Sequence, residues 1–183
     1  MTVPQHPSPQ HPTPAGQAPT DQPDDVGPLL LDDPPAIREA GIRLAAEARR
    51  EILIFSRDLD PHLYDQQPFL DAVQALALAR PQCPVRVLLF EPLAPVVGGH
   101  RLIELSRRLS SRIAIRRVAD DCRARTDAFL VSDALGYCLR RLADRHEALV
   151  DYRAPGTARR LRADFDQVWE QSDEDSELRR LCL

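Results

Sequence analysis

The sequence predicts one α/β domain with a mixed, mostly parallel sheet and helices on both of its faces, preceded by a disordered tail. Two observations predict it. Short, continuous apolar runs alternate with segments whose apolar residues recur at helical spacing. The length, 183 residues, suits one ordinary domain and an appendage. We place the tail at residues 1–32 and the single domain at residues 33–183.

The tail is predicted from its composition. Residues 1–35 hold ten of the 17 prolines and five aspartates but no arginine, so they have almost nothing to bury. The remaining residues carry 24 arginines against 23 acidic residues and are close to neutral, although the whole chain has a net charge of −4. A near-neutral domain gives no bulk electrostatic support to nucleic-acid binding. With neither an apolar leader nor a run long enough to span a bilayer, a cytoplasmic protein is expected.

The first half of the domain alternates helices and buried strands. Asp33 followed by two prolines is typical of a helix start, and Ile37, Ala40 and Leu44 then follow at helical spacing. Continuous apolar runs with little polar interruption indicate strands buried on both faces. Helices are expected to begin after Asp33 and to cover 68–79 and 100–109, and strands to cover 52–55, 85–90 and 113–118.

The second half is predicted to contain hairpins. A strand over 128–132 is followed by a tight turn at Asp133–Gly136 and by a partner strand over 137–141. A further strand is expected over 148–152. The closing helix begins near Pro155 and directs Phe165 and Trp169 inward.

Polar residues follow the first two strands, where ligands bind in open α/β sheets. A glycine pair, Gly98-Gly99, precedes the third helix, whose N-terminal N–H groups favour an anion, and arginines there can bind a phosphate or carboxylate bidentately. Simpler explanations are an Asx-capped turn after the first strand, glycines that only let the chain turn, and a histidine that caps its helix. The predicted anion-binding residues are Ser56, Arg57, Asp58, Asp60, His100 and Arg101.

The sequence contains no lysine and no asparagine. The lack of an ammonium side chain excludes P-loop phosphate binding, Schiff-base chemistry and Ser–Lys dyads. The four cysteines, Cys83, Cys122, Cys138 and Cys182, are scattered singly with no C-x-x-C pair, so neither a zinc site nor a disulfide framework is expected. No cofactor and no metal are predicted.

The segment from Asp127 to Arg141, a strand, a turn with aspartate and glycine, and a second strand, resembles the second half of a phospholipase-D-like domain. The signature of that superfamily is His-x-Lys, four residues and then Asp, followed by a Gly-Ser-x-Asn hairpin. The preceding helix–strand units and the closing helix match the order of that fold over roughly residues 35–180. The resemblance is to a degenerate bacterial branch that is sometimes fused to acetyltransferase domains of the GNAT type.

The chain departs from the signature at its reacting groups. Placing Asp133 on the aspartate of the signature puts Thr126 at the histidine and Ala128 at the lysine, while Cys138 and Arg140 stand near the small polar residues and asparagine. The resemblance implies a histidine nucleophile and lysines that stabilise the phosphoryl oxygens, and these groups are missing. Asp133 is therefore expected to form a turn. A rescue of the chemistry by Arg125 with Asp127 is disfavoured, because aspartate is a poor nucleophile toward an anion.

Three functions follow from these observations. The leading one is a non-catalytic phospholipase-D-like module that binds a small anion, a phosphate or a protein. The second is an enzyme with different acid–base chemistry at His100, helped by Asp58 or Asp60. The third is a regulatory adaptor for a GNAT-type acetyltransferase or within a homodimer, since phospholipase-D-like enzymes commonly pair two half-domains.

Overall fold

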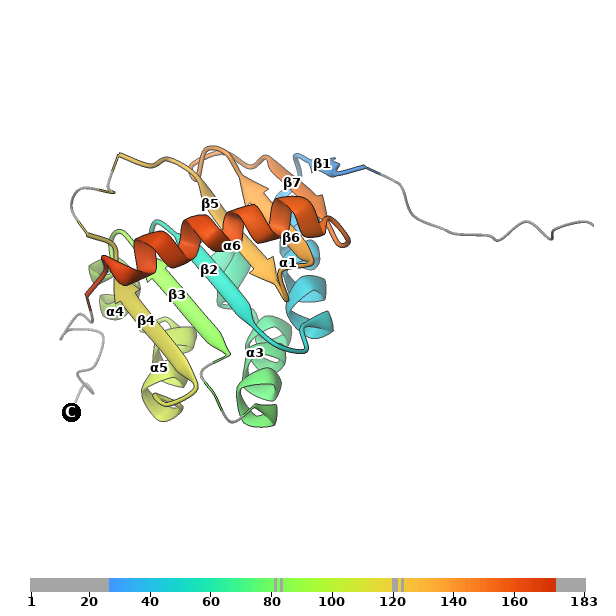
Figure 1. The fold of residues 1–183 in the computed structure, drawn as a ribbon. Coiled ribbons are helices and arrows are strands. Elements are labelled where there is room, and N and C mark those ends of the chain that lie inside the picture. The colour runs from blue at the N-terminus through green and yellow to red at the C-terminus, as the bar shows by residue number, and fades with distance from the viewer. Residues whose placement is uncertain (1–26, 81, 83, 120–121, 123, 174–183) are drawn as a thin grey trace, which may run out of the picture.

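The strands of the computed structural model form one sheet, and the structure describes residues 27–80, 82, 84–119, 122 and 124–173 (Figure 1). The strands are β1 (Leu29–Leu31), β2 (Ile52–Ser56), β3 (Val85–Leu89), β4 (Ile113–Arg117), β5 (Ala128–Ser132), β6 (Gly136–Arg140) and β7 (Ala148–Asp151). Their order across the seven-stranded sheet is β1-β7-β6-β5-β2-β3-β4.

The sheet is mixed, as predicted, but its parallel share is smaller than predicted. Only β2 with β3 and β3 with β4 are parallel; the other four pairings between these strands are antiparallel. The reason lies in the connections. Helices join β2 to β3 and β3 to β4, whereas β5, β6 and β7 follow one another through short turns, which allow only antiparallel neighbours.

Helices cover both faces of this sheet, which confirms that part of the prediction (Figure 1). Helix α6 crosses one face, and α1, α3 and α5 cover the other. The helices are α1 (Pro34–Glu47), α2 (Pro61–Tyr64), α3 (Gln67–Ala79), α4 (Leu93–Val97), α5 (Arg101–Arg108) and α6 (Pro155–Glu170). The four-residue α2 and five-residue α4 were not predicted, because so short a helix shows no periodicity.

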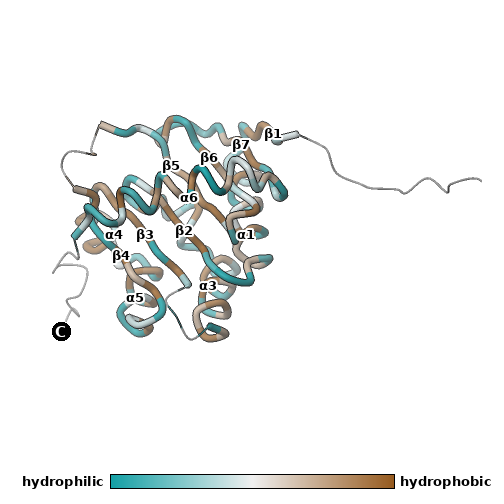
Figure 2. The backbone as a smooth tube through the Cα atoms, in the orientation of Figure 1, coloured by the Kyte–Doolittle hydropathy of each residue, from teal (hydrophilic) through white to brown (hydrophobic). Residues whose placement is uncertain are grey.

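Two apolar clusters hold the layers together. On one face, Ile54 and Val87 pack with residues of α1, α3 and α5. On the other, Phe55 and Leu88 pack with Phe165 and neighbouring residues of α6. All five residues of β2 are buried, as expected for a strand covered on both faces. Figure 2 shows hydrophobic colour along β2 and β3 and hydrophilic colour over much of α6.

The sheet includes a short strand from the segment expected to be part of the tail. Residues 1–26 of the expected tail lie outside the described residues, but Leu29–Leu31 form β1, which pairs antiparallel with β7. A three-residue strand between prolines and aspartates gives too short a pattern to be seen in the sequence. The helix start is confirmed: the Asp33 carboxylate accepts a hydrogen bond from the Ala36 N–H at 3.2 Å.

Asp133 lies in the turn between β5 and β6. Asp133 and Ala134 have φ values of 55° and 52°, and the Leu135 N–H donates to the Ser132 carbonyl at 2.9 Å. Positive φ at both central residues is typical of a type I′ turn, which matches the twist of a hairpin. The prediction that Asp133 forms a turn is therefore confirmed.

The Asp133 side chain also connects this turn to the segment between α1 and β2. Its carboxylate accepts hydrogen bonds from three consecutive backbone N–H groups, those of Arg49 at 2.7 Å, Arg50 at 2.7 Å and Glu51 at 2.9 Å. Hydrogen bonds to a charged group are stronger than neutral ones. This contact fixes the end of β5 beside the start of β2, more than 80 residues earlier in the chain.

Replacing Asp133 should destabilise the fold through this contact. Asp133→Ala removes the acceptor of three N–H groups. It also puts alanine, whose side chain makes no local hydrogen bond, at a positive φ, so the free energy of unfolding should fall by about 2–3 kcal/mol. Asp133→Asn, which tolerates the turn and keeps one acceptor oxygen, should lose less. Urea unfolding measures both, with the exposed Glu39→Ala as the control, expected within about 0.5 kcal/mol of wild type. An Asp133→Ala protein as stable as the control would contradict the role assigned to this carboxylate.

Candidate functional site

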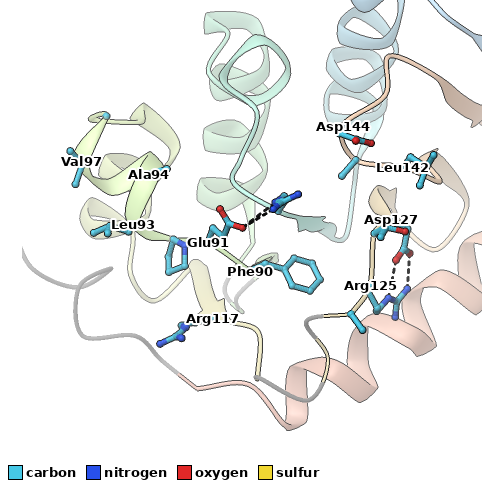
Figure 3. A pocket seen from close by; sticks show the side chains of 16 residues that line it. Phe90, Glu91, Leu93, Ala94, Val97, Arg117, Arg125, Asp127, Leu142 and Asp144 are labelled. Carbon is cyan, nitrogen blue, oxygen red and sulfur yellow. Dashed lines mark hydrogen bonds and ion pairs between the residues drawn. The ribbon is translucent and has the colours of Figure 1, made fainter.

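A cleft lies at the edge of the sheet where β2, β3 and β4 end. Because β5 runs antiparallel to β2, the residues before β5 and those after β6 reach the same edge. The cleft has a volume of about 1150 Å³. It is lined by Arg57, Phe90, Glu91, Pro92, Leu93, Ala94, Val97, Gly98, Arg117, Ala124, Arg125, Thr126, Asp127, Leu142, Ala143 and Asp144 (Figure 3).

Arg57 and Glu91 are neighbours in the cleft because the register of β2 and β3 continues past the strand ends. The Glu91 N–H donates to the Arg57 carbonyl at 2.8 Å, which extends the backbone pairing by two residues. The guanidinium then donates to the Glu91 carboxylate through Nε at 3.1 Å and Nη2 at 3.0 Å. Both side chains are more than half exposed. This ion pair is therefore open to solvent and to a ligand.

Arg125 and Asp127 form a second, more buried pair before β5. The guanidinium donates to both carboxylate oxygens, at 2.9 and 2.7 Å (Figure 3). Its centre lies 4.6 Å from the ring centroid of Phe55. The bond to Asp127 raises the pKa of Arg125 above its ordinary value. Ring stacking and a bidentate carboxylate fix this arginine in one orientation.

With the remaining charged residues, the lining of the cleft has as many carboxylates as arginines. Arg117, at the end of β4, adds a third arginine, and Asp144 adds a third carboxylate. The loop with Asp144 is held in place by the Ala143 N–H, which donates to the Thr126 carbonyl at 2.7 Å. Leu93 and Val97 of α4 are exposed at 65% and 78% and give the cleft an apolar rim. The cleft thus presents paired charges beside apolar surface.

The residues at the end of β2 and directly after it form a turn capped by side chains, which was the simpler explanation for them. The buried Ser56 hydroxyl accepts from the Leu59 N–H at 3.2 Å, and Asp60 accepts from the His62 N–H at 3.0 Å, which caps α2. Leu59 has a φ of 55°, so this is a tight turn with side-chain hydrogen bonds. Burial, together with the nearby charge of Asp60, raises the pKa of Asp58 above its ordinary value.

Asp60 also belongs to a different cavity from the cleft. Its second carboxylate oxygen lies 3.4 Å from Nη1 of the buried Arg140. Both residues line a cavity of about 260 Å³ together with His62 and His146. Arg140 further donates to the Ala143 and Arg145 carbonyls, so it supports the loop after β6.

Arg101 lies in a third hollow. It donates to Asp65 through Nε at 2.6 Å and to Gln67 through Nη1 at 2.8 Å. With Gln67 and other residues of α3 and α5 it lines a groove of about 390 Å³. Its guanidinium is therefore committed to the segment between α2 and α3.

His100 caps α5 from a buried position. Its Nδ1 accepts from the Leu102 N–H at 3.2 Å, which places the ring proton of the neutral form on Nε2. Nε2 is buried and has no hydrogen-bond partner among the described residues. Burial lowers the pKa of His100 below its ordinary value, although the charge of Asp65 opposes this. His100 lines none of the three cavities described here.

The six predicted residues therefore do not meet in one site. Only Arg57 lines the cleft, whereas Asp60 and Arg101 line two other hollows and His100 is buried in the fold. The sequence reasoning missed Arg117, although this residue lies near the end of the strand predicted over 113–118, and that signal was available. In the described part of the chain, no group of three His, Cys, Asp or Glu side chains is arranged to hold a metal, and no helix has the length and apolar character to cross a bilayer.

The buried cap gives a testable pH dependence. Below about pH 6.5 the unfolded state binds a proton at His100 that the folded state resists, so stability should fall as the pH drops. His100→Asn keeps a capping acceptor and removes this titration. The free energy of unfolding, measured by urea titration between pH 8 and pH 5, should fall less steeply for the variant, by at most about 1.4 kcal/mol per pH unit, the slope for one whole proton. Identical pH profiles for the two proteins would refute the assignment.

Solved structures share this architecture at low sequence identity. The archaeal chromatin protein TrmBL2, whose structure is described as showing a novel mode of DNA binding, matches with a TM-score of 0.58 and 16% identity over 86% of this chain and 57% of its own. Nuc from Salmonella typhimurium, a phospholipase D family member, matches with a TM-score of 0.53 and 13% identity over 75% of this chain and 90% of its own.

NucT from Helicobacter pylori matches with a TM-score of 0.55 and 12% identity over 81% of this chain and 98% of its own. This chain therefore spans most of each of the two Nuc-type structures but only about half of the archaeal protein. At these identities the likeness shows the fold, which is phospholipase-D-like. No curated protein matches the sequence. Residues 33–181 match the model of one family, and the chain therefore belongs to the family described as Domain of unknown function (DUF7931).

Proposed function

We propose that this domain is a non-catalytic phospholipase-D-like module that binds a small phosphate-bearing anion in the cleft. One observation carries the proposal. Arginines from the ends of two strands and from the start of a third, Arg57, Arg117 and Arg125, line a single cleft at the ligand-binding edge of an α/β sheet. Guanidinium groups bind phosphate oxygens bidentately.

The residues at the expected reacting positions support the lack of phosphodiester chemistry. Thr126, which stands where the resemblance places the histidine nucleophile, lines the cleft, and Ala128, at the lysine position, is buried. The chain has no lysine to replace it. Asp127 is held by Nε and Nη2 of Arg125, which leaves it a poor nucleophile and a poor base. The fold keeps the cleft, and its reacting side chains are replaced.

The Arg57–Glu91 pair is the part of the cleft that best suits an exchangeable ligand. Exposed ion pairs contribute roughly 0–1 kcal/mol, so a phosphate that takes the place of Glu91 on the guanidinium gives up little stability. Arg125 is less available, because Asp127 and Phe55 already hold it. We therefore assign first contact with the anion to Arg57.

The other candidate functions have weaker support. An acid–base enzyme needs His100 at a cavity, and the histidine instead caps a helix inside the fold. DNA binding is described for TrmBL2, but the lining of this cleft is charge-balanced. The apolar rim at Leu93 and Val97 is the feature that a protein partner would cover. A homodimer and a GNAT-type acetyltransferase partner stay predictions.

Anion binding is tested by thermal stabilisation. Inorganic phosphate, pyrophosphate and a nucleoside diphosphate at saturating concentration should raise the melting temperature by several degrees, since a ligand at 100 times its Kd adds about 2.7 kcal/mol. Arg57→Ala should weaken binding about tenfold or more, as expected when a charged hydrogen bond of about 1.5–3 kcal/mol is lost. Arg159→Ala, an exposed arginine of α6 outside the cleft, is the matched control. A panel without any shift, or an unchanged shift in Arg57→Ala, would contradict the proposal.

Catalysis is tested separately with bis(p-nitrophenyl) phosphate. No turnover above the rate of the buffer is expected, because Thr126 and Ala128 provide neither a histidine nucleophile nor a lysine. Thr126→Val serves as the control for trace activity from a contaminant, which the substitution would leave unchanged. A hydrolytic rate that disappears in Thr126→Val or Asp127→Asn would show that the domain is an enzyme.

A further inference from the structure

The smaller cavity, which Asp60 and Arg140 line together, has the make-up of a small-molecule site. Its volume is about 260 Å³. The polar residues of its lining are Asp60, His62, Arg140 and His146, and the apolar ones are Pro34, Ile37 and Leu63. Small-molecule sites combine apolar walls with a few polar groups and hold drug-sized ligands at volumes of about 300–1,000 Å³. This cavity therefore suits a ligand somewhat smaller than that.

Arg140 brings a buried positive charge to the cavity, and this residue is only 7% exposed. Its Nε and Nη2 donate to the Ala143 and Arg145 carbonyls, which leaves Nη1 as the nitrogen on the side of Asp60. Nη1 lies 3.4 Å from Oδ2 of Asp60, whereas such hydrogen bonds are usually about 2.7–3.2 Å long. In the described part of the chain, the buried cation thus has only a loose contact with its carboxylate.

Asp60 brings a carboxylate that also has room for another partner. Its Oδ1 accepts from the His62 N–H at 3.0 Å, and its Oδ2 has the long contact with Arg140. An ionised carboxylate can accept about four hydrogen bonds. Among the described residues, these two contacts leave part of that capacity unused. The cavity therefore presents a cationic donor and an anionic acceptor side by side.

A ligand with a single charge does not suit this pair of side chains. An anion bound to Arg140 would lie close to the like charge of Asp60, and a cation bound to Asp60 would lie close to Arg140. Like charges brought together in a partly buried site repel strongly. A molecule with a carboxylate and an ammonium group on neighbouring atoms avoids both repulsions, because each of its charges meets the opposite one.

We propose that this cavity binds a small α-amino acid with an apolar side chain. The ligand carboxylate accepts from Nη1 of Arg140, and the ligand ammonium donates to Oδ2 of Asp60. The apolar side chain packs against the apolar residues of the lining. His62 and His146 are exposed at the same cavity, so their rings report on binding. This inference does not depend on the anion proposed for the cleft.

NMR on the full chain tests this site with L-alanine, L-valine and L-leucine as probes. At least one of them should shift the ring C–H resonances of His62 and His146. The ring of His100, which lines none of the three cavities, should stay in place. For the probe that binds, the acid without the amino group and the amide without the carboxylate should each bind about tenfold more weakly or worse, as expected when one charged hydrogen bond is lost.

Asp60→Asn separates recognition from a structural role. Asparagine keeps an oxygen that caps α2 but removes the negative charge. Binding of the amino acid should weaken about tenfold or more, and binding of the acid without the amino group should become tighter, because a repulsion is removed. A variant that fails to fold could not show this gain.

Asp151→Asn is the matched control. Asp151 accepts from the Arg153 N–H at 2.8 Å, two residues further on, as Asp60 does from His62, but it lies outside the cavity. Its affinity for the amino acid should stay within about twofold of wild type. Arg57→Ala should also leave this affinity unchanged, which distinguishes the site from the cleft.

Three results would overturn the proposal. One is that none of the three amino acids, up to its solubility limit, shifts the rings of His62 and His146. Another is an equal affinity for the amino acid, the acid and the amide. The third is an equal effect of Asp60→Asn and Asp151→Asn on the affinity.

Discussion

The antiparallel placement of β5 beside β2 is the constraint on which the cleft depends. β2, β3 and β4 are parallel and end at one edge of the sheet, so β5 must begin at that edge if it runs the opposite way. Arg125 and Asp127 thereby come to lie across the cleft from Arg57 and Glu91. At the far end of the same strand, the three hydrogen bonds of Asp133 hold β5 in place.

The exclusive use of arginine suits this architecture. Arg86 contacts the carboxylates of Glu51 and Asp166, and its guanidinium lies 5.3 and 5.4 Å from the ring centroids of Phe165 and Trp169. Such a position between carboxylates and aromatic rings needs a planar cation with several donors, which an ammonium group cannot replace. Arginine therefore has a structural role in this fold as well as a place in the lining of the cleft.

Most of the fold could be predicted from the sequence, whereas most of the site could not. Strand β2 and helix α6 could be predicted because the apolar pattern of each lies within one continuous segment of the sequence. β1 was missed because three residues make no pattern. For the site, the expectation of a mostly parallel sheet directed attention to the ends of the first two strands. It gave no reason to place Arg125 at the same edge, and no local spacing shows that Arg101 is bound to Asp65, 36 positions away.

Arg140 connects the loop after β6 to the start of α2. Its guanidinium bonds to the Ala143 and Arg145 carbonyls on that loop and lies 3.4 Å from the Asp60 carboxylate at the start of α2. Residues 142–144 of this loop line the cleft, and Arg140 itself lines the smaller cavity. The two hollows therefore share one structural support, because the guanidinium that lines the second holds the loop that lines the first.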